Sequence, residues 1–265
     1  MVWPTCDDGR MPARHRKQSA SAPPGYFAWE AAGLGWLAGA GGAAVVTVLD
    51  QGADHLDLSL LSPAPPSPDA AERLGRGLAA THAAGAAAHG CGPPGWDGDG
   101  WLGPLSEPLP LALGAWDAWG PFYAQARLTA LLPLARQRGV LDAAEAAVLD
   151  RLADRVAAGT FDTAEPPARL HGDLWSGNVL WTAHDAVLID PAAHGGHREA
   201  DLAMLALFGA PHLERVLAAY DEAAPLADGW RERVLLHQVH PLLLHAVLFG
   251  GSYGTQVVRA ARRYA

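Results

Sequence analysis

Three polar residues in the C-terminal half of the chain have the types and spacing needed for phosphoryl transfer. Asp173 and Asn178 lie five positions apart in the stretch LHGDLWSGNVLW, on a predicted loop between two short apolar runs, and Asp190 ends the next apolar run, VLID. One carboxylate can accept or orient the proton of a substrate hydroxyl, whereas an amide oxygen and a second carboxylate are hard ligands for Mg²⁺. Together the three residues predict a magnesium-dependent phosphotransferase site.

Amino-acid usage also draws attention to this region. Asn178 is the single asparagine of the chain, Lys17 is the single lysine, and Ile189, directly before Asp190, is the single isoleucine. A chain rich in Ala, Gly, Arg, Pro and Leu is typical of a GC-rich genome, which replaces residues with AT-rich codons where replacement is harmless. The positions where such residues remain are therefore candidates for a functional need.

Composition limits the class of protein. The chain has 265 residues, of which 50% are hydrophobic and 18% are charged, which is enough for one globular domain of two lobes or for two small domains. Its net charge of −9 argues against a nucleic-acid partner, since the local run RHRK at 14–17 is too short to offset the acidic remainder. We expect small-molecule partners and a monomer or weak dimer.

Neither membrane insertion nor secretion is predicted. The uncharged stretch 31–49 contains five glycines and little Leu or Ile, and its end, GGAAVVTVL, is typical of a turn followed by a strand. The basic run at 14–17 is followed by QSASAPPG and not by the apolar core of a signal peptide. Cys6 and Cys91 form no disulfide framework, so the sequence fits a reducing cytoplasm.

The N-terminal elements can be placed from apolar spacing and turn residues. The stretch YFAWEAAGLGWLAGA predicts a short amphipathic helix that Gly41 and Gly42 end, and AAVVTVLDQG and HLDLSLL predict a strand hairpin joined at Gly52. The linker SPAPPSP places a candidate domain boundary near 62–68. Asp69 and Glu72 predict a capping box for a helix that runs to about Ala88.

The remaining chain is predicted to be mainly helical. A loop rich in Gly, Pro and Trp occupies 90–114, and its length is typical of a functional loop. Helices are expected over 115–138 and 142–158, with interruptions at Pro121 and Pro133. Short strands and turns follow from Arg169 to Asp190, and helices resume from about 198 to the end.

Two motifs resemble the fructosamine kinases, or ketosamine-3-kinases, from about Glu30 to the C-terminus. LHGDLWSGNVLW is followed by LIDPAAHGGHREADLAMLALFG, and these longer motifs differ from the barer pattern of aminoglycoside and choline kinases. The resemblance implies an α/β fold of the α+β type, protein-kinase-like and two-lobed. We expect a small, truncated, β-rich N-lobe over 1–62 and a mainly helical C-lobe over 63–265.

The resemblance also implies roles for the polar residues. Asp173 would be the catalytic base, Asn178 and Asp190 the magnesium ligands, and Asp201 a structural acid that braces the catalytic loop. We expect His171 to pack and hydrogen-bond behind that loop. ATP would be the phosphoryl donor, and the O3 hydroxyl of a ketoamine the acceptor.

Tryptophans are the expected walls of the acceptor site. Trp175 lies next to the predicted catalytic loop, and its indole offers a broad apolar face. Trp119 lies at helical spacing with Phe122 and Tyr123, a pattern that indicates core packing, although Trp119 could edge the sugar pocket.

Two other chemistries are disfavoured. His194, His197 and Glu199 could form a zinc site, but a loop entering a helix explains their positions equally well. Ser176 does not lie in the G-x-S-x-G pattern of a hydrolase nucleophile.

The nucleotide side is predicted from KQSASAPPGYFAWE. In members of the family a lysine ends a strand and holds the α- and β-phosphates, while a glutamate on the next helix orients it, and Lys17 and Glu30 occupy these positions. Arg14 is the alternative to Lys17 if the register shifts. Leu60 would contact the nucleotide in the hinge stretch LDLSLLSP, where Ser59 replaces the usual acid.

Only 16 residues precede Lys17, fewer than two strands and a glycine-bearing turn require, so we expect an incomplete phosphate lid and weak ATP binding. The predicted function is ATP- and Mg²⁺-dependent phosphorylation of a ketosamine, a fructosamine or ribulosamine, at O3. A small-molecule kinase of the aminoglycoside or choline kinase type, or a pseudokinase with impaired ATP binding, is the alternative.

Overall fold

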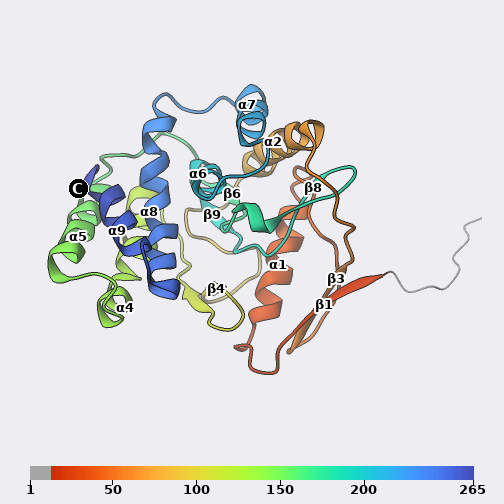
Figure 1. Cartoon of the computed structure of the whole chain (residues 1–265), viewed down its shortest axis with the longest axis horizontal. Helices are drawn as coiled ribbons and strands as arrows, with labels where there is room; N and C mark the ends of the chain where they lie inside the picture. Colours follow the sequence, from red (N-terminus) through yellow and green to blue (C-terminus); the bar gives the residue numbers. More distant parts are fainter. Residues whose placement is uncertain (1–12) are drawn as a thin grey trace, which may run out of the picture.

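The computed structural model describes residues 13–265 (Figure 1). Residues 1–12, which include Cys6 and the start of the predicted N-lobe, lie outside the described residues. Figure 1 shows a small sheet and helix α1 on one side of the molecule and most of the helices on the other. Within 13–265, no helix is both long and apolar enough to cross a membrane.

The N-terminal sheet contains three antiparallel strands in the order β1-β3-β2. The predicted hairpin is confirmed as β2 (Val48–Gln51) and β3 (His55–Ser59), and the Gly52 N–H donates to the His55 carbonyl at the turn. The polar run ARHR, which precedes Lys17, does not predict a buried strand. Residues there do form a strand, β1 (Arg14–Gln18), but it is an edge strand and mostly exposed.

Helix α1 (Tyr26–Ala38) covers one face of this sheet, as predicted from its apolar spacing. Phe27 and Leu34 of the helix pack against Leu56 and Leu58 of β3, and all four side chains are buried. The helix ends at a Gly39 cap, two residues before the predicted stop at Gly41. This packing fixes the helix, and hence Glu30, relative to β1.

The N-terminal segment is joined to a second hairpin, β7 (Val179–Trp181) and β8 (Ala186–Leu188). Val45 forms a parallel bridge to Leu188, and Pro63 forms an antiparallel bridge to Thr182. The β7–β8 hairpin therefore contacts the chain both just before β2 and just after β3. The predicted boundary near 62–68 stays a prediction.

Helix α2 (Pro68–Ala83) begins differently from our expectation. Its N-cap is Ser67, whose hydroxyl accepts from the Ala70 N–H at 3.2 Å, so the capping box of Asp69 and Glu72 is wrong. Ser67 has an extended backbone and precedes a proline at the first helical position, and both features favour a cap there. The helix also ends five residues before the expected Ala88.

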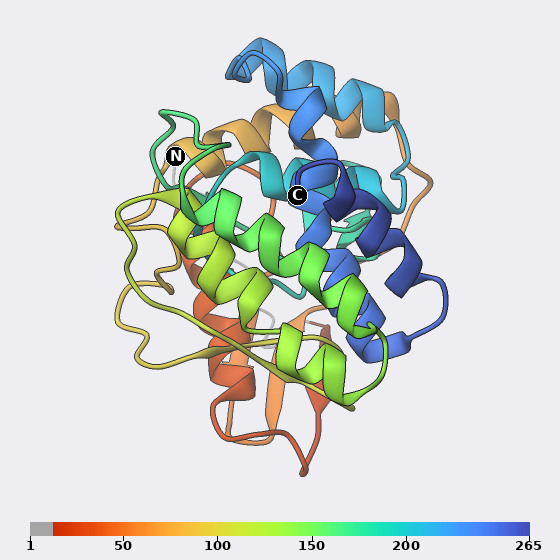
Figure 2. The ribbon, with the colours of Figure 1, turned by 90° about the vertical axis from the view of Figure 1, so that its left-hand side faces the viewer.

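Most of the C-terminal part is helical, as expected. Its elements are α3 (Trp119–Phe122), the π-helix η1 (Tyr123–Thr129), α4 (Leu132–Gln137), α5 (Ala143–Ala157), α6 (Glu199–Leu207), α7 (Leu213–Ala223), α8 (Trp230–Phe249) and α9 (Tyr253–Arg262). In Figure 2 the green helices α4 and α5 lie beside the blue helices α8 and α9, and their buried residues form the largest apolar core.

Short strands and one short helix connect these helices. They are β4 (Gly100–Leu102) and β5 (Leu109–Leu111) in the long loop, then β6 (Ala168–Leu170), β9 (His194–Gly196) and the 3₁₀ turn η2 (Ser176–Asn178). The predicted helix over 115–138 is divided into α3, η1 and α4, with Pro121 inside α3 and Pro133 at the start of α4. The loop predicted over 90–114 thus contains one small hairpin.

Helices α2 and α7 pack closely because Gly75 faces the backbone of α7. A Cβ at Gly75 would lie 2.2 Å from the Val216 carbonyl oxygen and 3.0 Å from the Ala219 Cβ. The close approach lets Leu74 and Leu78 of α2 reach Tyr220 in a buried apolar cluster. Glycine at this position therefore serves packing and not backbone flexibility.

Two glycine-to-alanine substitutions should have opposite effects on stability. Gly75→Ala should lower the free energy of unfolding by about 1–3 kcal/mol, because the added methyl meets backbone atoms that cannot move alone. Gly35→Ala is the matched control: it lies on the exposed side of α1 with nothing within 4 Å of its Cβ, and should stabilise by about 0.5–1 kcal/mol. Denaturant unfolding measures both, and stabilisation by Gly75→Ala would contradict the packing.

Candidate active site

A buried carboxylate in the first turn of α6 holds the loop that follows β6. Asp201 accepts the His171 N–H on one oxygen at 2.7 Å and the Gly172 N–H on the other at 3.0 Å. His82 of α2 lies 3.1 Å from the first oxygen. Burial alone would raise the pKa of Asp201, but His82 and the backbone donors outweigh it and hold that pKa below its usual value. Asp201 thus lies where the resemblance places a structural acid.

Gly172 allows the loop to turn at this point. Its φ of +80° lies in the left-handed region, and a Cβ there would lie 2.1 Å from the Ala192 carbonyl oxygen. Both the conformation and the contact exclude other residues. The turn directs the chain away from the line of β6, so that Asp173 and Asp190 line the same cleft.

Asp173 and Asn178 are hydrogen-bonded to each other. The Asn178 amide nitrogen donates to the Asp173 carbonyl at 2.8 Å and to its Oδ2 at 3.1 Å, and lies 3.4 Å from the Asp190 carbonyl. These acceptors orient the amide nitrogen inward and leave the carboxamide oxygen available to a ligand. Burial raises the pKa of Asp173 to about 7, although the bond from Asn178 opposes the change.

His171 lies behind this loop and hydrogen-bonds to it. Its Nδ1 accepts the Asp173 N–H at 3.3 Å, so Nε2 carries the hydrogen and donates to the Ile189 carbonyl at 2.9 Å. Burial lowers the pKa of His171, which keeps the ring neutral at physiological pH. The ring links the loop of Asp173 to the segment that carries Asp190.

Lys17 joins the N-terminal sheet to this loop. Its Nζ lies 2.6 Å from Glu30 Oε2 and 3.1 Å from Asp190 Oδ1. Burial opposes a charge on the amine, but the two carboxylates outweigh it and raise the pKa of Lys17. Arg14 lies on the other face of β1, where it pairs with Asp57, so the register favours Lys17 over Arg14.

Asp190 has a conformation that sequence reasoning missed. Its φ is +54°, which is uncommon for a residue with a Cβ and costs on the order of 1–2 kcal/mol. Strained residues of this kind concentrate at functional sites. The side chain of Asp190 remains 44% exposed although Leu188 and Pro191, close by in the sequence, are buried, so its carboxylate can reach a ligand.

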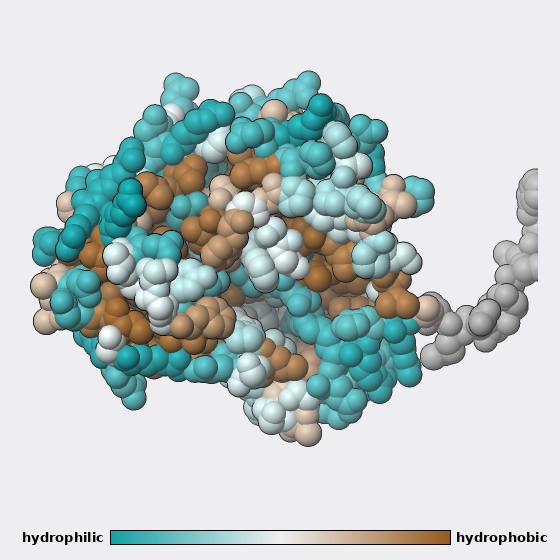
Figure 3. All heavy atoms as spheres, in the orientation of Figure 1, coloured by the Kyte–Doolittle hydropathy of each residue, from teal (hydrophilic) through white to brown (hydrophobic). Residues whose placement is uncertain are grey.

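One cleft of about 310 Å³, between the N-terminal sheet and the helical part, is lined by Lys17, Glu30, Asp173, Asn178 and Asp190. Aromatic and apolar side chains complete its walls. Trp101 comes from the loop predicted to be functional, whereas no sequence pattern had indicated Tyr26, Leu244, His245 and Phe249. Trp175 stands at the rim, 39% exposed, with its ring centre 6.2 Å from that of Phe208. Figure 3, in the orientation of Figure 1, shows hydrophobic residues exposed among hydrophilic ones.

Two predicted contact residues lie outside the cleft. Trp119 is 4% exposed and packs on Tyr123 and His237, so it belongs to the core and to a smaller cavity and not to the cleft wall. Leu60 is 55% exposed and lines none of the described cavities, and its role in nucleotide binding stays a prediction.

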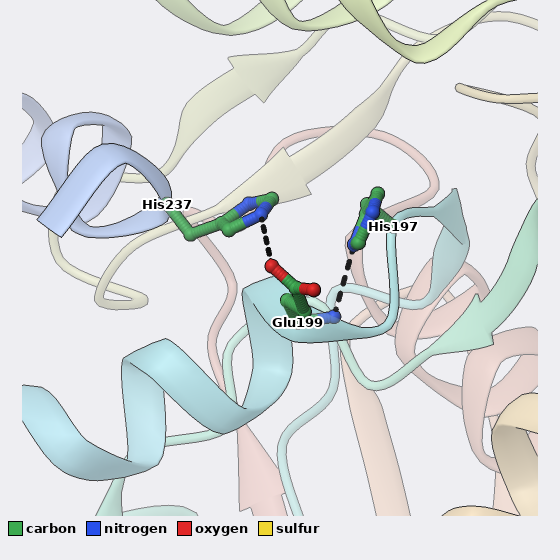
Figure 4. Close-up of side chains that lie close together, drawn as sticks. All are labelled: His197, Glu199 and His237. Carbon is green, nitrogen blue, oxygen red and sulfur yellow. Dashed lines mark hydrogen bonds and ion pairs between the residues drawn. The ribbon is translucent and has the colours of Figure 1, made fainter. Parts of the chain in front are cut away.

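The zinc alternative has little support in the geometry. His197, Glu199 and His237 lie close together (Figure 4), while His194 bonds the Ala192 carbonyl instead. The His197 Nδ1 accepts the Glu199 N–H, so its Nε2 carries the hydrogen that bonds Thr163 and neither nitrogen is free to bind a metal. The Glu199 carboxylate is also engaged by Arg233.

Comparisons with known proteins agree on one family. The model of the fructosamine kinase family matches residues 16–264. A probable ketoamine kinase of Synechocystis sp. is 36% identical over 185 residues, which cover 69% of this chain and 58% of the relative. A crystal structure from Thermobifida fusca, assigned provisionally as a fructosamine-3-kinase, is 47% identical with a TM-score of 0.86, over 94% of this chain and 84% of that chain.

The fold extends to more distant proteins. The ADP-bound aminoglycoside phosphotransferase APH(2'')-Ib is 13% identical, with a TM-score of 0.52 over 84% of this chain and 77% of that chain. This likeness shows the fold alone and confirms the predicted kinase-like fold class. The chain spans between about half and three fifths of the length of the curated relatives it matches, 58% for the protein from Synechocystis and 52% for one from Lactiplantibacillus plantarum.

Titration of Asp173 provides a test of the site that needs no substrate. Carboxyl carbon NMR, assigned by the loss of one signal in Asp173→Asn, should show this group titrating near pH 7 because burial disfavours its charged form. Asn178→Ala should raise that pKa further, since it removes a donor to the carboxylate. A midpoint near 4 in the wild-type protein would contradict the buried environment.

Proposed function

The chain belongs to the fructosamine kinase family, and on that premise we propose that it transfers the γ-phosphoryl group of ATP to the O3 hydroxyl of a ketosamine, a fructosamine or ribulosamine. The observation that carries the proposal is the meeting of Lys17, Asp190 and Asp173 in one cleft, on elements distant in the sequence. Family membership agrees with the resemblance read from the two motifs.

Lys17 would bind the phosphates of the nucleotide. Its charge is retained at neutral pH because Glu30 and Asp190 raise its pKa, and its side chain is 17% exposed and lines the cleft. Glu30 is buried, and its second oxygen, Oε1, has no hydrogen-bond partner among residues 13–265. Burial raises the pKa of Glu30, although the charge of Lys17 opposes the change.

Asn178 and Asp190 would hold Mg²⁺. A neutral amide oxygen and a carboxylate match the oxygen ligands that this ion prefers, and the hydrogen bonds of the Asn178 nitrogen leave that oxygen available. Bound Mg²⁺ would neutralise charge on the phosphates during transfer. The left-handed backbone of Asp190 directs its carboxylate to the same side as Lys17.

Asp173 would position the acceptor hydroxyl and take its proton. A pKa of about 7 suits this role, because a general base is most effective when its pKa is near the working pH. Above that pH the carboxylate is unprotonated and can accept a proton, and below it the group is neutral. Phosphoryl transfer otherwise depends on positioning and charge neutralisation, which the other residues would provide.

An acceptor panel tests the proposed function. With ATP and Mg²⁺, ribulosyl-lysine or fructosyl-lysine should be phosphorylated at O3, whereas choline and kanamycin should give no product. Asp173→Asn should lower kcat by about 10²-fold or more with ATP affinity nearly unchanged, since general-base catalysis contributes that much. The kcat/KM of the wild type should rise as the pH increases through about 7.

Product analysis by phosphorus NMR identifies the hydroxyl that is modified. Phosphorylation of choline or kanamycin in preference to any ketosamine would overturn the acceptor class. Product at a hydroxyl other than O3 would overturn the position alone, and ATP binding without turnover of any acceptor would favour the pseudokinase.

A further inference from the structure

A second, smaller cavity opens beside Asp173. Its volume is about 50 Å³, room for a few water-sized groups, and it shares Asp173, Leu102 and Leu244 with the main cleft. The rest of its wall comes from α3, η1, β6 and the loop after it, the segment around β9, α6 and α8, and most of these residues are buried. It is therefore a side pocket of the cleft, with the proposed base at the junction.

Arg127 is the unusual residue in this wall. Its side chain is buried at 2% exposure, and Nη1 donates to the Ala112 and Ala126 carbonyls at 2.9 and 3.0 Å. Nη2 has no hydrogen-bond partner, and no carboxylate of residues 13–265 forms an ion pair with the guanidinium. Burial lowers the pKa of Arg127 to about 9, so it is still cationic at neutral pH.

Burying a cation without an anionic partner lowers the stability of the folded protein. Arg127 is nevertheless buried in this wall. The guanidinium lies 4.6 Å from the centre of the Phe122 ring, which satisfies part of its charge but supplies no acceptor for Nη2. Arg127 also lies in a π-helix, a conformation that occurs often at functional sites. Both features indicate that Nη2 is kept for a ligand.

Two histidines provide acceptors beside this donor. His194 donates from Nδ1 to the Ala192 carbonyl at 2.8 Å, which leaves a lone pair on Nε2, and burial lowers its pKa to about 3. His240 has no side-chain hydrogen bond to the described residues, and burial also lowers its pKa. Both rings are neutral at physiological pH and can accept hydrogen bonds.

This mixture of groups selects a hydroxylated ligand. A carboxylate or phosphate would meet the lone pair of His194 and the carboxylates of Asp173 and Asp201, which also line the cavity. An apolar group would leave Arg127 and both rings without partners. A hydroxyl satisfies either kind of group, because it both donates and accepts.

We propose that this side pocket binds the hydroxylated carbons of the sugar beyond C3, with Arg127 donating to a sugar hydroxyl and His194 and His240 accepting from one. The proposal rests on the proposed function. It also sets the direction of the acceptor: the buried walls leave no exit for a bulky amine substituent, so the amine end points along the cleft toward the rim at Trp175.

A double-mutant cycle tests the assignment. Steady-state kinetics would compare ribulosyl-lysine with analogues that lack the C4 or the C5 hydroxyl, in the wild type and in Arg127→Met. The variant should lose about 10-fold to 100-fold in kcat/KM with the full sugar, because a hydrogen bond to a charged group is lost. With the analogue that lacks the partner hydroxyl, wild type and variant should be equal within threefold.

Controls separate this loss from other causes. Thermal unfolding shows whether Arg127→Met is folded, and His240→Leu tests the same wall if it is not. Replacing lysine by glycine as the amine should change the activity of wild type and variant by the same factor, since the amine lies at the other end.

Three outcomes decide the matter. The assignment of the side pocket is supported if Arg127→Met lowers kcat/KM with the full sugar but not with the analogue that lacks one distal hydroxyl. Equal losses for full and deoxy sugars, or coupling to the amine instead, overturn it. If the wild type phosphorylates no ketosamine, the proposed function itself fails and the side-pocket assignment falls with it.

Discussion

The two oxygens of Asp201 hold the arrangement on which the site depends. They accept neighbouring backbone N–H groups of the loop after β6, so the loop can take only one path past α6, and Asp173 follows directly. His82 completes the set and is itself hydrogen-bonded through Nδ1 to the Tyr220 hydroxyl of α7 at 2.8 Å. The close packing of α2 and α7 therefore has a functional consequence, because it places His82 against Asp201.

The N-terminal sheet contributes one charge to this framework. Lys17 reaches Asp190 because β1 pairs with β3 in a register that directs its side chain toward α1, whereas Arg16, one residue earlier, faces Asp57 at 2.6 Å. The left-handed backbone of Asp190 and the Nη2 of Arg127, which has no hydrogen-bond partner among the described residues, both lower stability, and they lie in the same region. Backbone strain and unsatisfied hydrogen-bond donors lower the stability of a protein, and they are expected where the local structure serves ligand binding.

Features that depend only on residues close together in the sequence could be predicted from it. The polar spacing of Asp173, Asn178 and Asp190 marked the site, because a loop and a short hairpin bring such neighbours together without help from the rest of the chain. Apolar spacing likewise predicted α1 and the β2–β3 hairpin. The roles of His82 and Arg127 could not be predicted, since their significance comes from residues far away in sequence and from a cavity. Helical spacing identified the apolar face that carries Trp119 but not the wall that it contacts, which is that of the smaller cavity.

If the buried carboxylate of Asp201 positions the reacting groups, the kinetics of Asp201→Asn will show it. The substitution keeps the shape of the side chain but replaces one acceptor by a donor facing the loop N–H groups. A folded variant should lose about 10²-fold in kcat, the cost of a misplacement of about 1 Å, with the KM for ATP within threefold of wild type. A folded Asp201→Asn protein with kcat within threefold of wild type would show that Asp201 does not position the reacting groups.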